Sequence, residues 1–184
     1  MAAPSASVWA IGDVTGVLMF THVGKHQGRI TAADIRGREA RADYRAVPRV
    51  VFTAPQAAAV GRADGDQRGA ARVADVPRTF TYEHPADRPS LLTLVAEGHV
   101  LVGAFAVGPE AREWIGQATV AIRAGVPLDV LRDVIQPFPT FSEIFVKALD
   151  EICGPIGDCP TSAALAAAAP SPRRGRVPSP FPGA

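Results

Sequence analysis

A lone carboxylate after an apolar run is the first group in this chain that could do chemistry. The stretch Val8–Gly16, VWAIGDVTG, is typical of a buried strand that stops on a Gly-Asp pair, Gly12 and Asp13, before a helix. In a parallel α/β sheet, ligands bind beyond the carboxyl ends of the strands, so Asp13 could accept hydrogen bonds from ligand hydroxyl groups. It could also cap the helix that follows, and the local residues alone favour the cap.

Two histidines one helical turn apart form a second candidate. His22 and His26 could in principle chelate a metal ion from one face of a helix. Zinc sites use three or four ligands, however, and the sequence offers no third ligand nearby. The spacing favours two histidines that pack beside a ligand or an interface, and we predict no metal site.

The stretch IQPFPTFSEIF contains a third candidate, Glu143. Thr140 followed by Glu143 before an apolar run is a capping box, in which each side chain satisfies the other residue's backbone N–H. A cap explains this glutamate without any chemistry. The two prolines of the stretch fix an extended approach to the helix, and Phe138 and Phe141 are predicted to be core or interface anchors.

The cysteines are a fourth candidate. The chain has two, Cys153 and Cys159, which are too few for a disulfide framework. Their separation matches neither a C-x-x-C redox motif nor a zinc knuckle. A redox pair stays open as an alternative, but free thiols are the favoured interpretation.

Composition excludes several classes of function. Hydrophobic residues make up 47% and charged residues 20% of the chain, and the net charge is +1, as in an ordinary globular protein. This balance gives no support to nucleic-acid binding. The longest apolar run, Val100–Val107, is far below the roughly 18 residues of a membrane helix, and Met1–Ser7 has no signal-peptide features. We therefore expect a cytoplasmic protein with no membrane partner.

Hydrophobic periodicity predicts the elements that must position these groups. A helix is expected over Val17–Ile35, then a charged linker over Arg36–Ala46, then strands and finally helices. Strands followed by helices imply an α+β domain whose antiparallel sheet is covered on one face. The predicted strands are Val47–Thr53, Ala71–Val76, Thr79–Tyr82 and a hairpin of Ser90–Ala96 with Val100–Val107, and the predicted helices are Glu110–Ala124, Pro127–Ile135 and Thr140–Ile152.

The helix Glu110–Ala124 is expected to lie on the sheet, with Pro109 suited to its first position and Gly125 to its stop. Its apolar stripe consists of Ala111, Trp114, Ile115, Ala118 and Ile122.

Two further stretches show no pattern of a helix or strand. No G-x-G-x-x-G follows a strand, and the glycines of GRADGDQRG (residues 61–69) are predicted to lie in a polar loop, so the sequence offers no cradle for a dinucleotide pyrophosphate. Residues 153–184, rich in alanine and proline, are predicted to be a disordered tail, with Arg173, Arg174 and Arg176 solvated.

Taken in order, five blocks resemble the carboxyl-terminal third of flavin-dependent pyridine nucleotide-disulfide oxidoreductases, whose familiar members are mercuric reductase and dihydrolipoamide dehydrogenase. The resemblance covers about Val8–Ile152, and the order and spacing of the blocks make it more specific than any one of them alone. The blocks are VWAIGDVTG, FTHVGKHQGRI, VPRVVFTAPQAAAVG, GHVLVGAFAVGPEAREWI and QPFPTFSE.

The resemblance implies a division of the chain and a set of FAD contacts. It implies that residues 1–36 are the end of an FAD-binding domain, 37–46 a linker and 47–152 a dimerisation domain, in a family whose two subunits complete each other's active sites. By resemblance Gly12 and Asp13 match the second FAD motif, with the carboxylate on the ribitol chain. Thr21 and His22 match the start of the helix near the pyrimidine end of the flavin.

Departures from the family pattern limit what the resemblance implies about activity. The family carries His-Pro-Thr-x-x-Glu near its end, where the histidine is an acid/base and the glutamate orients it. Here Glu143 matches the orienting position, but Phe138 replaces the base, and a phenyl ring cannot transfer a proton. A second departure is TAPQ in place of T-D-P-E, so that Ala54 and Gln56 remove two charges.

The expected function follows from the resemblance and its departures. In the intact parent we expect NAD(P)H-dependent electron transfer through FAD, whereas the isolated chain is expected to show no turnover and to retain FAD weakly. The alternative is a non-enzymatic homodimeric interaction module, or the partner of a separately encoded flavin-binding half.

Overall fold

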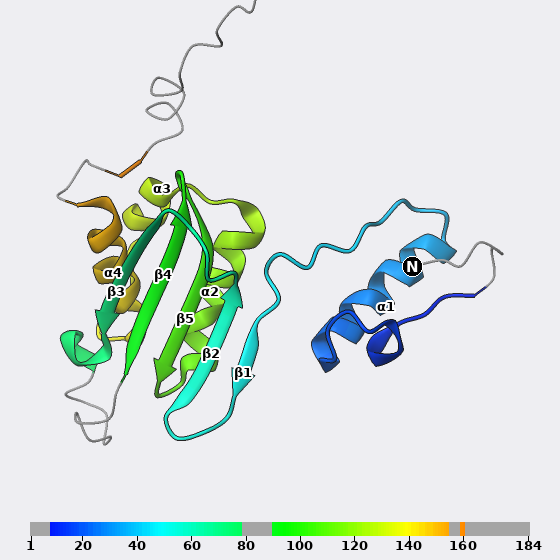
Figure 1. The fold of residues 1–184 in the computed structure, drawn as a ribbon, viewed down its shortest axis with the longest axis horizontal. Coiled ribbons are helices and arrows are strands. Elements are labelled where there is room, and N and C mark those ends of the chain that lie inside the picture. The colour runs from blue at the N-terminus through cyan, green and yellow to red at the C-terminus, as the bar shows by residue number, and fades with distance from the viewer. Residues whose placement is uncertain (1–7, 79–89, 155–158, 161–184) are drawn as a thin grey trace, which may run out of the picture.

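The computed structural model of the protein describes residues 8–78, 90–154 and 159–160. The strands among these residues form one antiparallel sheet in the order β1-β2-β5-β4-β3 (Figure 1). Helices follow the strands in the chain, so the predicted α+β class is confirmed. The strands are β1 (Arg49–Val51), β2 (Gln56–Gly61), β3 (Gln67–Arg72), β4 (Leu91–Glu97) and β5 (Val100–Gly108), and the helices after them are α2 (Ala111–Ala124), α3 (Leu128–Asp133) and α4 (Ile144–Cys153).

The predicted hairpin is confirmed as β4 and β5. Alternate residues of β4, Leu92, Leu94 and Ala96, are fully buried, as expected for a strand with one face on the core. Gly98 in the turn has a φ of 59°, a conformation that glycine adopts without the steric cost of a Cβ. Local residues therefore determine this part of the sheet.

Helices α2 and α4 cover one face of the sheet (Figure 1), α2 over β2 and β5 and α4 over β3 and β4. The indole N–H of Trp114 donates to the Pro109 carbonyl over 2.8 Å, and Gly125 ends α2 with a φ of 62°. The helix begins at Ala111 rather than Glu110, because Glu110 takes a left-handed conformation and precedes the first turn. The predicted apolar stripe is confirmed, since Ala111, Trp114, Ile115, Ala118 and Ile122 are all buried.

The contact between α4 and β3 depends on Gly69. A Cβ built at this position would lie 2.0 Å from the carbonyl oxygen of Ala148 and 2.8 Å from Cγ1 of Ile152. Only a residue without a side chain lets the α4 backbone come this close to the strand. The prediction that residues 61–69 form a polar loop is therefore wrong at both ends, where Gly61 belongs to β2 and Gln67–Gly69 belong to β3.

The amino-terminal segment lies beyond the β1 edge of the sheet (Figure 1) and contains a short 3-10 turn, η1 (Gly12–Thr15), and α1 (Thr21–Ile35). The predicted strand that starts at Val8 and stops on Gly12-Asp13 is wrong. A strand is stable only when a neighbour pairs with its backbone, and none of the named strands pairs with this stretch. The predicted helix is confirmed but starts four residues late, because Phe20 is still extended and serves as the N-cap.

Other boundaries also differ from the predictions. Strand β2 was not predicted, since its alanine-rich sequence lacks the β-branched alternation of a typical strand. The predicted strand Ala71–Val76 ends at Arg72, where a 3-10 turn, η2 (Val73–Asp75), begins. The predicted helix Thr140–Ile152 starts with another 3-10 turn, η4 (Phe141–Glu143), before α4. The predicted strand Thr79–Tyr82 and the tail with Arg173, Arg174 and Arg176 lie outside the described residues.

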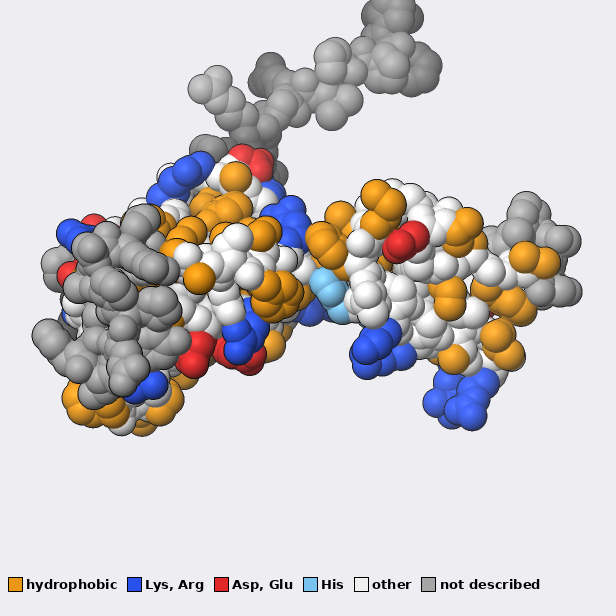
Figure 2. All heavy atoms as spheres, turned by 90° about the horizontal axis from the view of Figure 1, so that it is seen from below, with side chains coloured by type: hydrophobic (Ala, Val, Ile, Leu, Met, Phe, Trp, Pro, Cys, Tyr) orange, Lys and Arg blue, Asp and Glu red, His pale blue; other side chains and the backbone are white. Residues whose placement is uncertain are grey.

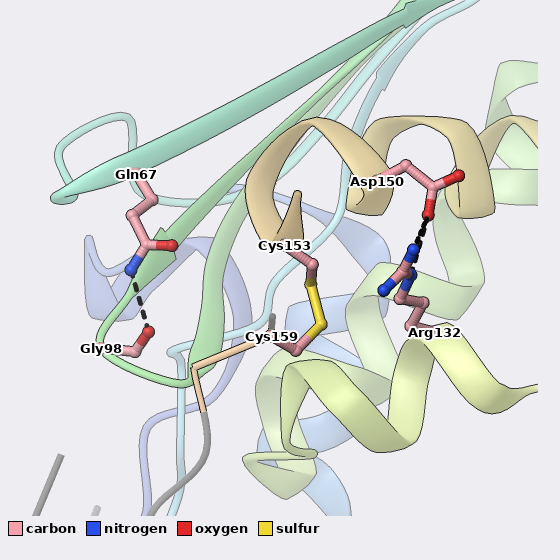
Figure 3. Close-up of a disulfide and its surroundings, with 6 residues drawn as sticks. All are labelled: Gln67, Gly98, Arg132, Asp150, Cys153 and Cys159. Atoms are coloured by element: carbon pink, nitrogen blue, oxygen red, sulfur yellow. Dashed lines mark hydrogen bonds and ion pairs between the residues drawn. A yellow bond between two sulfur atoms is a disulfide. The ribbon is translucent and has the colours of Figure 1, made fainter. Parts of the chain in front are cut away.

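The two cysteines form a disulfide (Figure 3), so the prediction of free thiols is wrong. Cys153 is the last residue of α4, and Gly154 then turns the chain with a φ of 69° and a ψ of −156°. The Cα atoms of Cys153 and Cys159 lie 4.1 Å apart. Sequence spacing could not indicate this pairing, because it depends on how the chain leaves the helix.

Across the described ranges, no helix has the length and apolar character needed to cross a bilayer.

Candidate functional site

The turn around Gly12 is held by one buried side chain, Gln27 of α1. Its Oε1 accepts the backbone N–H of Gly12 over 2.6 Å. Its Nε2 donates to Thr15 Oγ1 at 3.2 Å and to the Tyr44 hydroxyl at 3.1 Å. Gln27 is 5% exposed, so these bonds satisfy an amide that would be costly to bury alone. One helix residue therefore joins η1, α1 and the linker.

The Asp13 side chain projects from this turn into solvent. Its carboxylate makes no hydrogen bond or ion pair with any residue that the structure describes, and only its backbone carbonyl is used, by the Gly16 N–H at 3.0 Å. The N-cap residues are Ile11 for η1 and Phe20 for α1, and neither caps through a side chain. The cap interpretation of Asp13 is therefore wrong, and the carboxylate is available to accept hydrogen bonds from a ligand.

Thr21 and His22 begin α1 and are exposed. The ring of His22 stacks on that of Phe20, with centroids 5.1 Å apart, and its Nε2 lies 2.9 Å from the Pro48 carbonyl oxygen. A carbonyl only accepts, so Nε2 of His22 donates this hydrogen bond. His22 thus links α1 to the residues that lead into β1.

His26 lies against the linker and does not share the contacts of His22. Its ring meets that of Tyr44 edge-on at 6.2 Å, and its Nε2 is buried without a hydrogen bond. No group of three or more metal-ligating side chains occurs in the part of the chain that the structure describes. The two histidines therefore contact different neighbours, His22 the ring of Phe20 and the Pro48 carbonyl, and His26 the ring of Tyr44.

The segment before α4 contains the predicted capping box. The Thr140 N–H donates to Glu143 Oε2 over 3.1 Å, and the Thr140 hydroxyl donates to the Pro137 carbonyl at 2.7 Å. Phe141 is buried, which confirms it as a core anchor, whereas Phe138 is 74% exposed. The core alternative for Phe138 is thus wrong, and the interface alternative remains.

Within one chain, the two groups of candidate residues lie apart. Gly12, Asp13, Thr21 and His22 belong to the segment beyond β1, whereas Glu143 leads into α4, which packs on β3 at the opposite edge of the sheet (Figure 1). A site that used both groups would need residues from a second chain.

Comparison with known proteins identifies the sheet and its helices. Residues 47–149 match the model of the pyridine nucleotide-disulphide oxidoreductase dimerisation domain. The chain belongs to this family. It is 33% identical over 151 residues to dihydrolipoyl dehydrogenase 3 of Haloarcula marismortui, a match that covers 77% of this chain and 31% of that protein. It is 35% identical over 158 residues to the dihydrolipoyl dehydrogenase of Halobacterium salinarum, covering 80% and 33%.

The fold agrees with this family. The HOCl-induced flavoprotein disulfide reductase RclA from Escherichia coli superposes with a TM-score of 0.71 at 28% identity, over 80% of this chain and 36% of that one. Its Cu(II) complex superposes with a TM-score of 0.70 over 79% and 35%. The chain thus spans about a third of the length of the relatives it matches.

The sheet face opposite the helices has an apolar hollow. A pocket of about 370 Å³ lies between Phe20 of the amino-terminal segment and side chains of β1, β2, β4 and β5, among them Val51, Phe105 and Val107. Figure 2 shows that hydrophobic side chains are exposed on both the sheet and the α1 segment. Both are therefore suited to further contacts with protein.

The sequence does not predict two contacts around the linker, those of Gln27 and Asp43. Gln27 lies four residues after the buried Val23, and this helical spacing was the available signal. Asp43 in the linker binds Arg45 at 2.6 Å and approaches Arg123, in the last turn of α2, at 3.5 Å. The Arg45 hydrogen bonds hold the pKa of Asp43 well below its ordinary value. No local pattern indicates the Arg123 contact, since it joins distant parts of the chain.

The loop TAPQ, which lacks the two charges of T-D-P-E, also makes a contact that the sequence does not predict. The Gln56 side-chain oxygen accepts the backbone N–H of Arg112 at 3.3 Å. An uncharged side chain here thus satisfies one of the free N–H groups at the start of α2.

Proposed function

We propose that the protein supplies the homodimer interface of an FAD-dependent oxidoreductase that takes electrons from NAD(P)H. Residues 47–152 would form the dimerisation domain, joined by a linker at 37–46 to residues 1–36 of the FAD-binding part. The membership of residues 47–149 in the family supports this division. Because NAD(P)H is an intracellular reductant, we also propose a cytoplasmic location.

The described residues of the amino-terminal segment fit FAD. The exposed Asp13 carboxylate has no partner among them, so it can accept hydrogen bonds from ribitol hydroxyl groups. The first backbone N–H groups of α1, at Thr21 and His22, suit the electron-rich carbonyl oxygens of the flavin pyrimidine. Gln27 fixes the turn that carries Asp13. When bound, FAD would accept a hydride and pass its electrons on.

We propose that the electron acceptor is not a dithiol or disulfide that needs proton transfer at position 138. Two observations carry this: the phenyl ring of Phe138 is exposed, and the carboxylate of Glu143, five positions later, is already used by the Thr140 N–H. A quinone, a metal ion or a dye needs no acid/base there. Because the related RclA forms a Cu(II) complex, a metal ion is the first of these acceptors to test.

The second candidate is a dimeric interaction module without turnover, or the partner of a separately encoded flavin half. It is favoured by a group of exposed apolar side chains on α2, on α3 and in the segment before η4. These are Val120, Val130, Val134, Ile135 and Phe138.

Two measurements on the purified chain test these proposals. Light scattering after size exclusion should give the mass of a dimer. FAD titration should give weak binding that D13N weakens further, whereas D133N, an exposed carboxylate at the end of α3, should leave it unchanged. Equal effects of the two substitutions would contradict the role of Asp13, and a monomer at all concentrations would contradict the interface.

A stoichiometric flavin band in the purified chain would contradict the expected weak retention. A dimer without any FAD binding would favour the interaction module.

A further inference from the structure

The Cys153–Cys159 disulfide lies in the apolar core at the end of α4 (Figure 3). Cys153 is 2% exposed and Cys159 is 8% exposed. The sequence holds only these two cysteines, so every thiol or disulfide signal of the protein reports this pair. The bond fixes residue 159 against the core that α4 helps to form.

Helix α4 is held at three other places. Its start follows the Thr140–Glu143 capping box, and its middle touches β3 at Gly69. Arg132 of α3 binds Asp150 over 2.8 Å on the side shown in Figure 3. Besides the hydrogen bonds within the helix, the last turn has the bond from the Gly154 N–H to the Asp150 carbonyl at 2.9 Å, and Ile152 packs against the core. The disulfide adds a covalent restraint to that turn, because it ties Cys153 to residue 159.

We propose that Cys153–Cys159 is a redox-sensitive bridge, which a dithiol reductant opens and whose opening loosens the last turn of α4. This goes beyond the proposed electron transfer and does not rest on it. The bridge closes a short loop of sequence separation 6, and both cysteines are packed in the core. Opening the bridge should therefore lower the stability of the folded state.

The reduction is a two-step exchange. One thiolate of the dithiol attacks Sγ of Cys159, the more exposed cysteine; the S–S bond breaks, and Cys153 leaves as a thiolate that takes a proton. The second thiol of the reductant then displaces Cys159, which also leaves with a proton. The reductant loses two electrons and two protons and becomes a cyclic disulfide, and the protein gains two thiols.

Thiol counting tests whether the bridge exists. The whole chain, unfolded in guanidinium without reductant, should show no free thiol, and two after treatment with dithiothreitol. Two free thiols before treatment would overturn the proposal. The folded chain should also release both thiols in excess dithiothreitol and lose them again with oxidised glutathione. A folded chain that cannot be reduced would overturn the redox sensitivity.

Melting curves test the consequence. Dithiothreitol should lower the melting temperature of the wild-type chain by at least about 5 °C. The variant C153S/C159S should melt near the reduced wild type and should not respond to dithiothreitol. Reduction of both sulfurs without a change in melting temperature would overturn the structural role of the bridge.

Hydrogen exchange on the wild-type chain provides a readout that does not need the variant to fold. Dithiothreitol should speed amide exchange at Ile152 and Cys153 at least about fivefold, with no such change in α2. Unchanged exchange at the end of α4 after complete reduction would overturn the proposed coupling.

Discussion

Gln27 Oε1 accepts the backbone N–H of Gly12 over 2.6 Å, across fifteen positions of sequence. The bond joins the turn that carries Asp13 to the middle of α1. Gln27 also reaches the linker through Tyr44, so one buried amide holds η1, α1 and the linker together. The position of the Asp13 carboxylate thus depends on a buried side chain distant in sequence.

We predict that Q27A loosens this turn. The substitution removes the acceptor of the Gly12 N–H and the donor to Thr15, and the loss of such buried bonds costs about 1–3 kcal/mol. Amide exchange at Gly12 should therefore rise at least about fivefold, and binding of FAD should weaken. Q117A on α2 is the control and should leave exchange at Gly12 unchanged. Unchanged exchange at Gly12 in Q27A would show that the turn has another support.

We predict that G69A destabilises the sheet domain, because the new methyl group would overlap the Ala148 carbonyl. Overpacking of this kind costs about 1–3 kcal/mol. G116A is a matched control: a Cβ at Gly116, within α2, meets no atom within 4 Å. It should stabilise the protein by about 0.5–1 kcal/mol. Urea unfolding measures both, and equal midpoints for the two variants would contradict the close contact of α4 with β3.

We predict that F138A weakens the homodimer without unfolding the chain. Phe138 is 74% exposed, so its truncation should change the free energy of unfolding by no more than about 0.5 kcal/mol. If Phe138 is an aromatic anchor of the interface, F138A should raise the dimer dissociation constant about tenfold or more. Sedimentation measures the constant, and V14A, an equally exposed change in the amino-terminal segment, is the control. A dissociation constant that F138A leaves unchanged would place the interface elsewhere.

The parts of the fold that were predictable have local causes. The β4–β5 hairpin and α2 follow from alternating or helically spaced apolar residues ended by Gly98 and Gly125. Strand β2 could not be predicted, because Ala57–Ala59 become a strand only through pairing with β1 and β5.

The candidate site was predictable to a similar degree. The Thr140–Glu143 capping box is local and was predicted correctly. The cap expected from the position of Asp13 is not formed, and the role of Gln27 depends on contacts between segments distant in sequence.

The linker contact of Asp43 gives a prediction about pH. The side-chain and backbone hydrogen bonds of Arg45, with a smaller contribution from Arg123, lower the pKa of Asp43 in the folded chain. A carboxyl with a depressed folded pKa stabilises the fold above its unfolded pKa of about 3.9, and the stabilisation is lost as the pH falls through the folded pKa. D43N lacks this charge at every pH.

We therefore expect D43N to melt slightly below the wild type near neutral pH, and the difference to shrink as the pH is lowered below about 3.9. Added salt should also shrink it, because the ion pairs are exposed. E39Q is the matched control: Glu39 pairs with Arg41 in the same linker but has no partner on the sheet domain among the described residues. A melting difference that stays constant with pH would show that Asp43 acts through packing, and an equal effect of E39Q would show that the contact with Arg123 contributes nothing.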